Sequence, residues 1–557
     1  MRNFWSSFLV VLVAFTLVKC AQPRPLTGGE KDTDSPDIKN SYPKNLSTSF
    51  HGHTIILEFD EYVQVKSLSS ELIVSPPLQY PIEYKIKGKR VIFSIKDTLL
   101  PNTTYNFNFG SSIVDLNERN ALDSNLFVIS TSKKIDSGSI SGVVIDAYTQ
   151  KPVKGATVLL YSSAVDSAVY NGAPSYVAKT NKKGEYKLQY LNERPYQIYA
   201  LETPGQEFRY IPFTKVAFDM DYVSPDQKEP TDLFLFQELD TMQYISTEKA
   251  LNYYSFVLAF NVNLEKPSFR LEPSNDTTKY IIEEITADSF LFWVEGDRNL
   301  DSVHVLISDQ TGYNDTVDIG LKDRTKFYKK LKRKKQTSHP LTLKLNTNGG
   351  NLDYFDSIRL NFSRPIESWD LDQMLFVVNE DTIPIKEAIK TKVIAVSYAL
   401  SKYGNRKDTR STIIHHKWLP KHKYAFIFYP DAFTDILNQS NDTSIMKFTT
   451  KTFEDYGSFR FTVNVPDYGG PLLMELLNEK GKFIRDYEIH SGQVIHHELA
   501  KPGKYKIRLI LDRNGNRKWD TGDLGKSTQP EEVVYYDGVI EIRSNWDMEE
   551  IWNVDLK

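Results

Sequence analysis

The sequence predicts an all-β fold, an elongated string of β-sandwiches, and three observations lead to this prediction. Tyr and Phe are abundant, with 32 and 31 residues among 557, and aromatic side chains favour pleated, half-buried strands. Short segments that alternate apolar and polar residues recur along the chain, with turn residues between them. Long apolar stripes at helical spacing are scarce. A chain of this length has room for several domains of roughly 100 residues each.

Residues 1–19 are predicted to be a signal peptide. Arg2 supplies a positive charge, and an apolar run with one Thr follows at residues 8–18. A run this short cannot span a bilayer as a helix, which needs roughly 20 residues. A charged start followed by a short apolar core is typical of secretory signals.

Cys20 is the only cysteine of the chain and directly follows this segment. The sequence Leu17-Val18-Lys19-Cys20 resembles a bacterial lipobox in its Leu and its Cys, and departs from it at Lys19, where a small residue is expected. We expect cleavage before Cys20 and attachment of lipid to its thiol. An uncleaved anchor and a free thiol in an ordinary exported protein are the alternatives. With a single cysteine, no disulfide framework is possible.

Residues 20–35 are predicted to be a lipid-anchored tether. The segment is rich in proline, glycine and mixed charges. Such a composition buries too little apolar area to offset the entropy lost on ordering.

The first domain is predicted at residues 36–132. The segment HTIILEFDEYVQV alternates apolar and polar residues, and ELIVSPPL, YPIEYKIKGKRVIFSI, TTYNFNFGSSIVDL and LFVISTS follow at short intervals. Several short strands at this spacing are typical of a β-sandwich.

Three segments of this region carry a resemblance to a known family: CAQPRPLTGGEKDTDSPDI, PKNLSTSFHGHTIILEFDEYVQV and ELIVSPPL. They resemble the start of Ig-like-domain lipoproteins from Bacteroidetes, whose first domain is similar to the Ig-like domains of S-layer proteins. The resemblance is most specific over residues 20–131. It implies an envelope protein held by an N-terminal lipid, and it supplies no catalytic residues.

The second domain, predicted at 135–240, resembles the prealbumin-like or carboxypeptidase-regulatory-like β-sandwich. The resemblance lies in GSISGVVIDAYTQKPVKGATVLLYS and YVAKTNKKGEYKLQYLNERPYQIYAL. It implies that Gly142, Pro152, Gly155 and Gly184 fall at turn positions. Gly184 would supply a positive φ at a hairpin tip.

A third sandwich of Ig-like type is predicted at 241–340, from the strand-like segments YSFVLAFNVNL, KYIIEEITADSFLFWVEG and SVHVLISD. It ends in the basic run KFYKKLKRKKQTSHP, residues 326–340. We interpret this run as a solvated hairpin or linker; the alternative is contact with the phosphates of acidic lipid or lipopolysaccharide.

The chain then repeats itself. LPNTTYNFNFGSSIVDLNERNALDSNLFVIST at 100–131 and LPKHKYAFIFYPDAFTDILNQSNDTSIMKFTT at 419–450 have equal length and share Leu-Pro, a Tyr and the Phe-x-Phe spacing in position. A second Ig-like domain is therefore predicted at 341–452. Residues 455–557 echo the second domain and are predicted to form another prealbumin-like sandwich.

One loop could bind calcium. The segment DRNGNRKWDTGD places five oxygen-bearing side chains at positions 1, 3, 5, 9 and 12 of a loop: Asp512, Asn514, Asn516, Asp520 and Asp523. Calcium takes several oxygen ligands from such a spacing, as in the EF-hand. Arg517 stands where the EF-hand has its glycine, Asp523 is shorter than the usual Glu, and a strand rather than a helix precedes the loop. The alternative is a hairpin whose Asp and Asn side chains cap their own backbone.

Charge and motifs narrow the function. The formal net charge is −4 and the pI about 6.3, so no basic field favours nucleic acid. The pairs His415-His416 and His496-His497 lie in predicted strands, where neighbours point to opposite faces and cannot chelate one ion. The sequence contains no Gly-x-Ser-x-Gly, His-Glu-x-x-His or phosphate-binding glycine loop. We therefore expect no enzyme activity.

Two functions remain. The first is a lipoprotein of the outer membrane, on its periplasmic or cell-surface face, that acts as a scaffold or accessory subunit and binds other envelope or outer-membrane proteins. The second is a surface carbohydrate-binding module, for which the aromatic content would supply stacking platforms.

Overall fold

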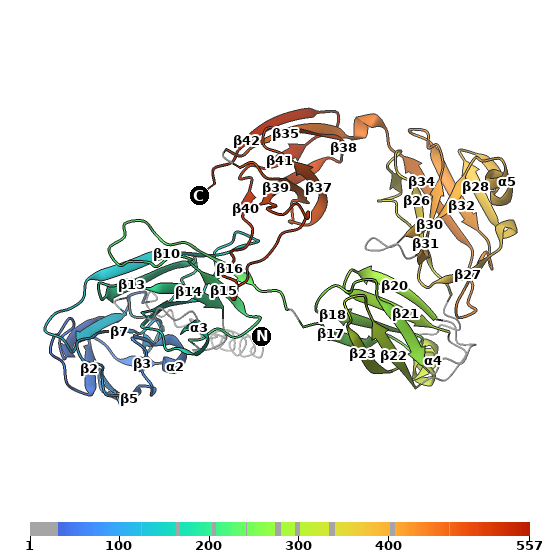
Figure 1. Ribbon diagram of the computed structural model, residues 1–557. Helices are drawn as coiled ribbons and strands as arrows, with labels where there is room; N and C mark the ends of the chain where they lie inside the picture. The colour runs from blue at the N-terminus through green and yellow to red at the C-terminus, as the bar shows by residue number, and fades with distance from the viewer. Residues whose placement is uncertain are drawn as a thin grey trace, which may run out of the picture. The chain divides into compact units, whose positions relative to one another are not determined.

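The computed structural model describes residues 32–123, 125–162, 168–202, 208–240, 242–272, 280–295, 301–333, 340–400, 407–466 and 468–556 (Figure 1). These residues form strands with few and short helices, so the predicted all-β class is confirmed. The chain divides into two compact units, Met1–Gln237 and Glu238–Lys557. The predicted signal peptide, Cys20 and most of the predicted tether lie outside the described residues.

Unit 1 begins with a sandwich around one apolar core. Its strands follow the predicted alternation, because Ile55, Leu57 and Phe59 are buried while the residues between them are half-exposed. The four-stranded sheet has the order β1 (Ile38–Tyr42), β2 (Thr54–Phe59), β6 (Arg90–Ser94) and β5 (Glu83–Lys87). The three-stranded sheet has the order β4 (Ile73–Ser75), β7 (Thr104–Asn108) and β9 (Leu126–Ser130), β3 (Val63–Val65) pairs with β8 (Ile113–Asp115), and α2 spans Leu68–Glu71.

The second core of unit 1 belongs to a seven-stranded sheet. Its order is β12 (Tyr176–Lys179), β11 (Thr157–Tyr161), β14 (Gln197–Glu202), β15 (Lys215–Phe218), β16 (Leu233–Gln237), β10 (Gly138–Asp146) and β13 (Glu185–Leu191); α3 spans Ala168–Asn171. β10 pairs antiparallel with β13 and parallel with β16. The core side chains come from both halves of this sheet.

Two glycines of this sheet have different roles. Gly184 has φ +76° and its N–H donates to Asn181 O at 3.0 Å in the turn before β13, as predicted. Gly142 lies inside β10, so its predicted turn position is wrong. A Cβ at Gly142 would lie 1.8 Å from Thr231 O, and this close backbone approach is what requires glycine there.

Unit 2 begins with two facing sheets. The first has the order β17 (Ile245–Ala250), β18 (Ser255–Phe260), β21 (Ser289–Val294) and β20 (Tyr280–Thr286); the second has β19 (Ser268–Glu272), β22 (Ser302–Ser308) and β23 (Asn314–Gly320). The first part of the following basic run lies in the helix α4 (Arg324–Arg333), so the interpretation as a hairpin or linker is wrong for residues 326–333. Residues 334–339 of the run lie outside the described residues. Asp323 explains the start of the helix, because its Oδ1 accepts the N–H groups of Thr325 and Lys326 at 2.7 and 3.1 Å.

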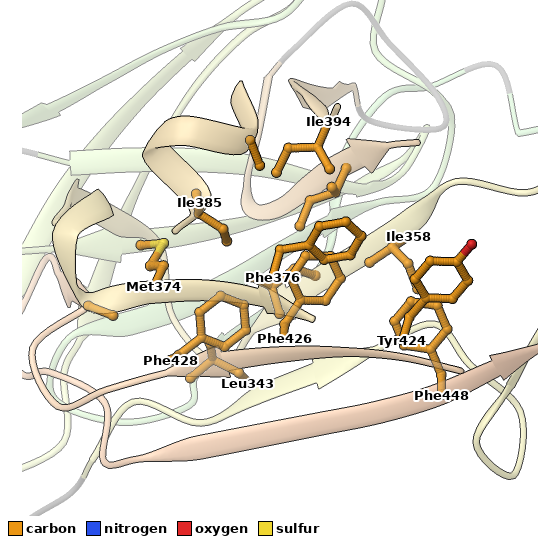
Figure 2. Close-up of a cluster of buried hydrophobic side chains, with 14 of the residues drawn as sticks. Leu343, Ile358, Met374, Phe376, Ile385, Ile394, Tyr424, Phe426, Phe428 and Phe448 are labelled. Atoms are coloured by element: carbon orange, nitrogen blue, oxygen red, sulfur yellow. The ribbon is translucent and has the colours of Figure 1, made fainter. Parts of the chain in front are cut away.

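The next core of unit 2 is rich in aromatic side chains. Figure 2 shows Phe376, Phe426 and Phe428 beside Met374 and Ile385 within it. One sheet has the order β24 (Leu343–Leu345), β26 (Ile358–Phe362), β31 (Lys407–His415) and β30 (Ala395–Leu400). The other has β25 (Asn351–Leu352), β34 (Ser444–Thr450), β32 (Lys423–Phe428), β28 (Met374–Val378) and β29 (Asp381–Pro384); β27 (Ile366–Trp369) pairs with β33 (Phe433–Asp435), and η1 (Leu371–Gln373) and α5 (Ile385–Lys390) complete the region.

The last core of unit 2 lies between a three-stranded and a five-stranded sheet. The first has the order β38 (Val494–Ala500), β35 (Gly457–Asn464) and β42 (Asp547–Asn553), and η2 (Phe453–Asp455) precedes it. The second has β37 (Phe483–Ile489), β36 (Leu472–Asn478), β39 (Gly503–Leu511) and β40 (Val533–Tyr535), with β41 (Ile540–Ile542) also on β39. The predicted calcium loop leaves the end of β39.

The repeat seen in the sequence corresponds to matching hydrogen bonds. Tyr105 Oη accepts the N–H of Leu100 at 2.8 Å, and Tyr424 Oη accepts the N–H of Leu419 at 3.0 Å. The carbonyl groups of the same two leucines accept the hydroxyls of Thr131 and Thr450, at 2.8 and 2.5 Å. In both copies, the tyrosine and the closing threonine therefore form hydrogen bonds to the backbone of the leucine that precedes strand β7 or β32.

Candidate functional site

The predicted calcium loop starts at a buried carboxylate. Asp512 directly follows β39 and is 1% exposed. Its Oδ1 accepts the N–H of Asn516 at 3.1 Å, and its Oδ2 accepts the N–H of Arg517 at 2.8 Å. The first residue of the loop therefore organises the turn that follows it.

Arg517 occupies the position at which the sequence pattern calls for glycine. Its φ is +61°, in the left-handed region that glycine adopts most easily. The guanidinium Nη2 lies 2.8 Å from Asp486 Oδ2 on β37. The sharp turn thus forms although its left-handed residue is arginine rather than glycine. The side chain of this strained residue forms an ion pair with β37.

The two asparagines present their amide nitrogens to one carboxylate. Asn514 and Asn516 both donate Nδ2 to Asp520 Oδ2, at 2.6 and 2.8 Å. Their Oδ1 atoms accept backbone N–H groups, from Asn516 at 3.0 Å and from Lys518 at 2.8 Å. Four of the five predicted ligands are therefore joined in one network.

Asp523 stands apart from this network. Its carboxylate accepts the N–H and the ammonium of Lys526, at 2.9 and 2.8 Å. The hydrogen bond from the Lys526 side chain is the main cause of a lowered pKa of Asp523. As the structure stands, the fifth predicted ligand serves a local turn.

Glu531 is a carboxylate of the loop that sequence reasoning missed. It is 4% exposed, and its oxygens accept the N–H groups of Arg513 at 2.7 Å and Asp520 at 3.1 Å. Burial raises the pKa of Glu531, the two backbone hydrogen bonds oppose the rise, and the charges of Asp520 and Asp512 add to it. It lies eleven positions after Asp520, beyond any loop motif; its place just before a strand was the one available signal.

The loop as described is a hairpin that satisfies its own polar groups. In the part of the chain that the structure describes, no three His, Cys, Asp or Glu side chains gather as a metal site would require. Calcium binds oxygen, so both asparagine side chains would have to rotate until Oδ1 rather than Nδ2 faces the ion. The orientation of such an amide is assigned from its hydrogen-bond partners. Calcium binding stays a prediction.

A second set of buried polar side chains lies at the junctions between cores. In unit 1, Ser75 Oγ accepts the N–H of Val177 at 2.8 Å, and Asn106 Nδ2 donates to Gln189 O at 2.7 Å. These contacts join the sheet of β4 and β7 to strands β12 and β13. A polar cavity of about 260 Å³ lies beside them, lined in part by these residues.

The first junction of unit 2 is built around a carboxylate that is 7% exposed, Glu283 of β20. Arg410 of β31 donates Nε to Glu283 Oε2 at 2.7 Å, and its guanidinium lies 5.3 Å from the centre of the Trp293 ring. Burial raises the pKa of Glu283, and the charge of Arg410 opposes the rise. Apolar side chains continue the contact, since Ile436 and Leu437 pack against the cluster formed by Tyr253, Tyr254, Leu291 and Trp293.

The second junction of unit 2 is built around Asp353. Tyr456 donates its hydroxyl to Asp353 Oδ1 at 2.5 Å, Lys451 Nζ lies 3.2 Å from the same oxygen, and Lys501 pairs with Oδ2. Burial alone would raise the pKa of Asp353, but the hydrogen bonds and charges of these partners lower it. The carboxylate of Asp353, which follows β25, thus contacts one residue before η2 and two residues that flank strands of the last sandwich.

Among the described residues, no helix has both the length and the apolar character needed to cross a membrane.

Several solved structures are similar to this chain at low sequence identity. The major pilin subunit BcpA of Bacillus cereus is 8% identical, and the alignment covers 75% of this chain and 99% of the pilin with a TM-score of 0.15. Domains 1–6 of the surface layer protein SbsC are 9% identical, with coverages of 91% and 67% and a TM-score of 0.14. The protein SGBP-B of the Bacteroides ovatus mixed-linkage glucan utilization locus is 8% identical, with coverages of 72% and 94% and a TM-score of 0.17.

At TM-scores this low, these likenesses carry no argument about the fold or the function of this chain. No curated protein matches the sequence significantly. The family model of the bacterial Ig-like domain matches residues 32–132. The first sandwich of unit 1 is therefore similar over its whole length to the bacterial Ig-like domain family.

Proposed function

We propose that this chain is a non-enzymatic lipoprotein of the bacterial outer membrane, of the Bacteroidetes type, that serves as a scaffold or accessory subunit of an outer-membrane protein complex. In this proposal Cys20 carries the lipid and residues 20–35 form the tether. The sandwiches that follow present their outer surfaces to other envelope proteins. The non-enzymatic part of the proposal rests on the lack of catalytic motifs in the sequence.

The construction of the junctions is the observation that best supports the proposal. Glu283 and Asp353 are buried carboxylates that each bind side chains from another core of unit 2. Burying such groups costs desolvation free energy, and well-packed apolar residues would stabilise a junction at least as well. What directed ion pairs add is a defined geometry. A fixed spacing between neighbouring domains is useful to a protein that positions its partners.

The proposal is tested by purification of the tagged, full-length protein from membranes solubilised in mild detergent. We expect a stable envelope protein to co-purify with the native chain. The same partner should be depleted when Arg410→Ala loosens the first junction of unit 2, while Arg359→Ala, at a more exposed ion pair with Asp408, should retain it. Purification of the native chain as a lone monomer would contradict the proposal.

The alternative, a surface carbohydrate-binding module, makes a different prediction for the same preparation. The purified chain would then bind surface polysaccharides on a glycan array and would retain no protein partner. Binding to glycans without a co-purifying protein would replace the scaffold proposal by this one.

A further inference from the structure

The helix α4 is an isolated block of positive charge on a protein whose formal net charge is −4. Residues 322–333 contain seven Lys and Arg residues and one acidic residue, Asp323. The acidic residue is already engaged, because it caps the helix and lies 4.0 Å from Lys326 Nζ. Asp323 therefore balances at most one of the seven positive charges of residues 322–333.

One side of α4 is fixed to the sandwich by aromatic contacts. The ring of Phe327 meets those of Tyr253 and Tyr254 edge-on, with centroids 5.2 and 6.2 Å away. The Tyr328 hydroxyl lies 3.1 Å from that of Tyr253, and the Arg324 guanidinium lies over the Tyr253 ring at 5.6 Å. These contacts explain how a short helix of such high charge persists, since isolated helices of this length are marginal in water.

The cations of the last two turns are exposed and have no partner within the described part of the chain. This set consists of Lys329, Lys330, Lys332 and Arg333. The structure gives none of them an ion pair or a hydrogen bond to any described residue. Cations near the C-terminal end of a helix also interact favourably with the negative end of its dipole. We call these four residues the α4 basic patch.

We propose that the α4 basic patch binds the phosphate headgroups of an anionic lipid surface. Three of its four cations are lysines, compact point charges on flexible stems that suit a layer of mobile phosphates without fixed geometry. Tyr328, the exposed aromatic residue of α4, is hydrogen-bonded to Tyr253, so it does not offer a free platform for stacking a nucleic-acid base. The proposal adds a second membrane contact to the proposed lipid anchor and does not depend on that anchor.

The test uses the mature chain with Cys20→Ser, expressed without residues 1–19, which retains every described residue and lacks the lipid. Its binding is measured by co-sedimentation with phosphatidylcholine vesicles that contain about one third phosphatidylglycerol, and with vesicles of phosphatidylcholine alone. We expect binding to the anionic vesicles only, and its loss when NaCl rises from about 0.1 to about 0.5 M.

The deciding variant replaces all four patch residues by Gln, which favours helices as Lys and Arg do. We expect its vesicle affinity to fall at least about 30-fold, since each cation near such a surface contributes roughly five-fold. The matched control carries Lys85→Gln, Lys87→Gln, Lys182→Gln and Lys183→Gln, which changes the net charge equally at exposed sites of unit 1. The control should bind as the parent does, and both variants should keep its circular dichroism spectrum.

Equal affinities of the patch variant and the control would overturn the proposal. So would binding of a soluble polyanion, such as heparin or RNA, by the parent chain without binding to the anionic vesicles. Failure of the lipid-anchor proposal would appear elsewhere, as an unmodified Cys20 in the native protein, and would leave this result unaffected.

Discussion

Arg410 Nε lies 2.7 Å from Glu283 Oε2, and this hydrogen bond joins β31 to β20, strands that belong to different cores of unit 2. Thr409 adds a hydroxyl contact to the other oxygen of the same carboxylate at 3.3 Å. The carboxylate of Glu283 is buried, whereas the side chain of Arg410 is about one third exposed. A buried acid on one domain is thus neutralised by a base that reaches it from the next.

Arg410→Ala should destabilise unit 2. The substitution leaves Glu283 buried without its cation, and such losses cost 3–5 kcal/mol when both partners are buried. Because Arg410 is partly exposed, we expect roughly 2 kcal/mol. Urea unfolding followed by Trp fluorescence measures it, with Arg359→Ala as the matched arginine control, expected within about 0.5 kcal/mol of the parent. Equal effects of the two substitutions would refute a special role of this pair.

Asp353 should make unit 2 sensitive to acid. Its pKa is lowered from 3.8 in the folded chain, so its contribution to stability is present above that value and is lost as pH falls through the lower, folded-state pKa. Asp353→Asn should therefore lower the free energy of unfolding at pH 7 and flatten its decline between about pH 5 and pH 2. Urea midpoints over this pH range provide the measurement.

Asp356 supplies a control of opposite sign. Partial desolvation, together with the charge of Asp353, raises the pKa of Asp356 above 3.8. Its contribution is present below the unfolded pKa and is lost as pH rises through the folded one, and it is small because the residue is exposed to solvent. Asp356→Asn should make the decline in stability on acidification steeper. If both substitutions flatten the curve, the assignment of these two carboxyl groups is wrong.

The repeated tyrosine contact should stabilise both copies by a similar amount. Tyr105→Phe and Tyr424→Phe each remove the hydroxyl that accepts a backbone N–H, and each should cost about 1 kcal/mol. Tyr222→Phe is the control, because Tyr222 is half-exposed and its hydroxyl has no hydrogen bond among the described residues. Thermal unfolding of the three variants would disprove a shared role if only one copy responded.

Calcium should raise the thermal unfolding midpoint if the 512–523 loop binds it. Asp520→Asn should abolish the response, because Asp520 meets both asparagine amides. Asp523→Asn should preserve it, because this carboxylate binds Lys526. The measurement is a calcium titration by differential scanning fluorimetry against a chelator blank. An unchanged midpoint at millimolar calcium would leave the loop as a self-capped hairpin.

Cys20→Ser should leave the sandwiches folded and release the chain from the lipid. Metabolic labelling with a radioactive fatty acid should mark the native chain and miss the variant. Lys19→Ala serves as the companion change, because it restores the small residue that a lipobox expects and should speed processing. Labelling of Cys20→Ser at the native level would exclude this thiol as the attachment point.

The sequence determined the class of fold, because strand periodicity is local. Ile55, Leu57 and Phe59 are buried, as the alternation of apolar and polar residues predicts. Gly184 stands between two strand-like segments, and this position predicted its positive φ in a hairpin turn. The equal spacing of Tyr105 and Tyr424 in their segments likewise led to matching contacts. These features depend on neighbours within a few tens of residues.

Two predictions were wrong, one made from a local pattern and one implied by a family resemblance. The basic run around Phe327 has too little apolar content to suggest a helix, and its helix depends on rings at Tyr253 and Tyr254 that lie more than seventy positions earlier. Gly142 was expected in a turn, although its true requirement is the carbonyl group of Thr231. Neither partner can be inferred from the segment itself.

By itself, the sequence determined that this chain is built of β-sandwiches, that its one cysteine precedes a segment rich in proline, glycine and charged residues, and that its loop at 512–523 is rich in side chains that carry oxygen. Only the tertiary structure decided that Glu531 joins this loop while Asp523 leaves it. It also decided that Glu283 meets Arg410 and that Asp353 meets Lys501. The physical reason is range: alternation and turn chemistry act between near neighbours, whereas a buried charge is satisfied by whichever partner the packing of distant segments brings within a few ångströms.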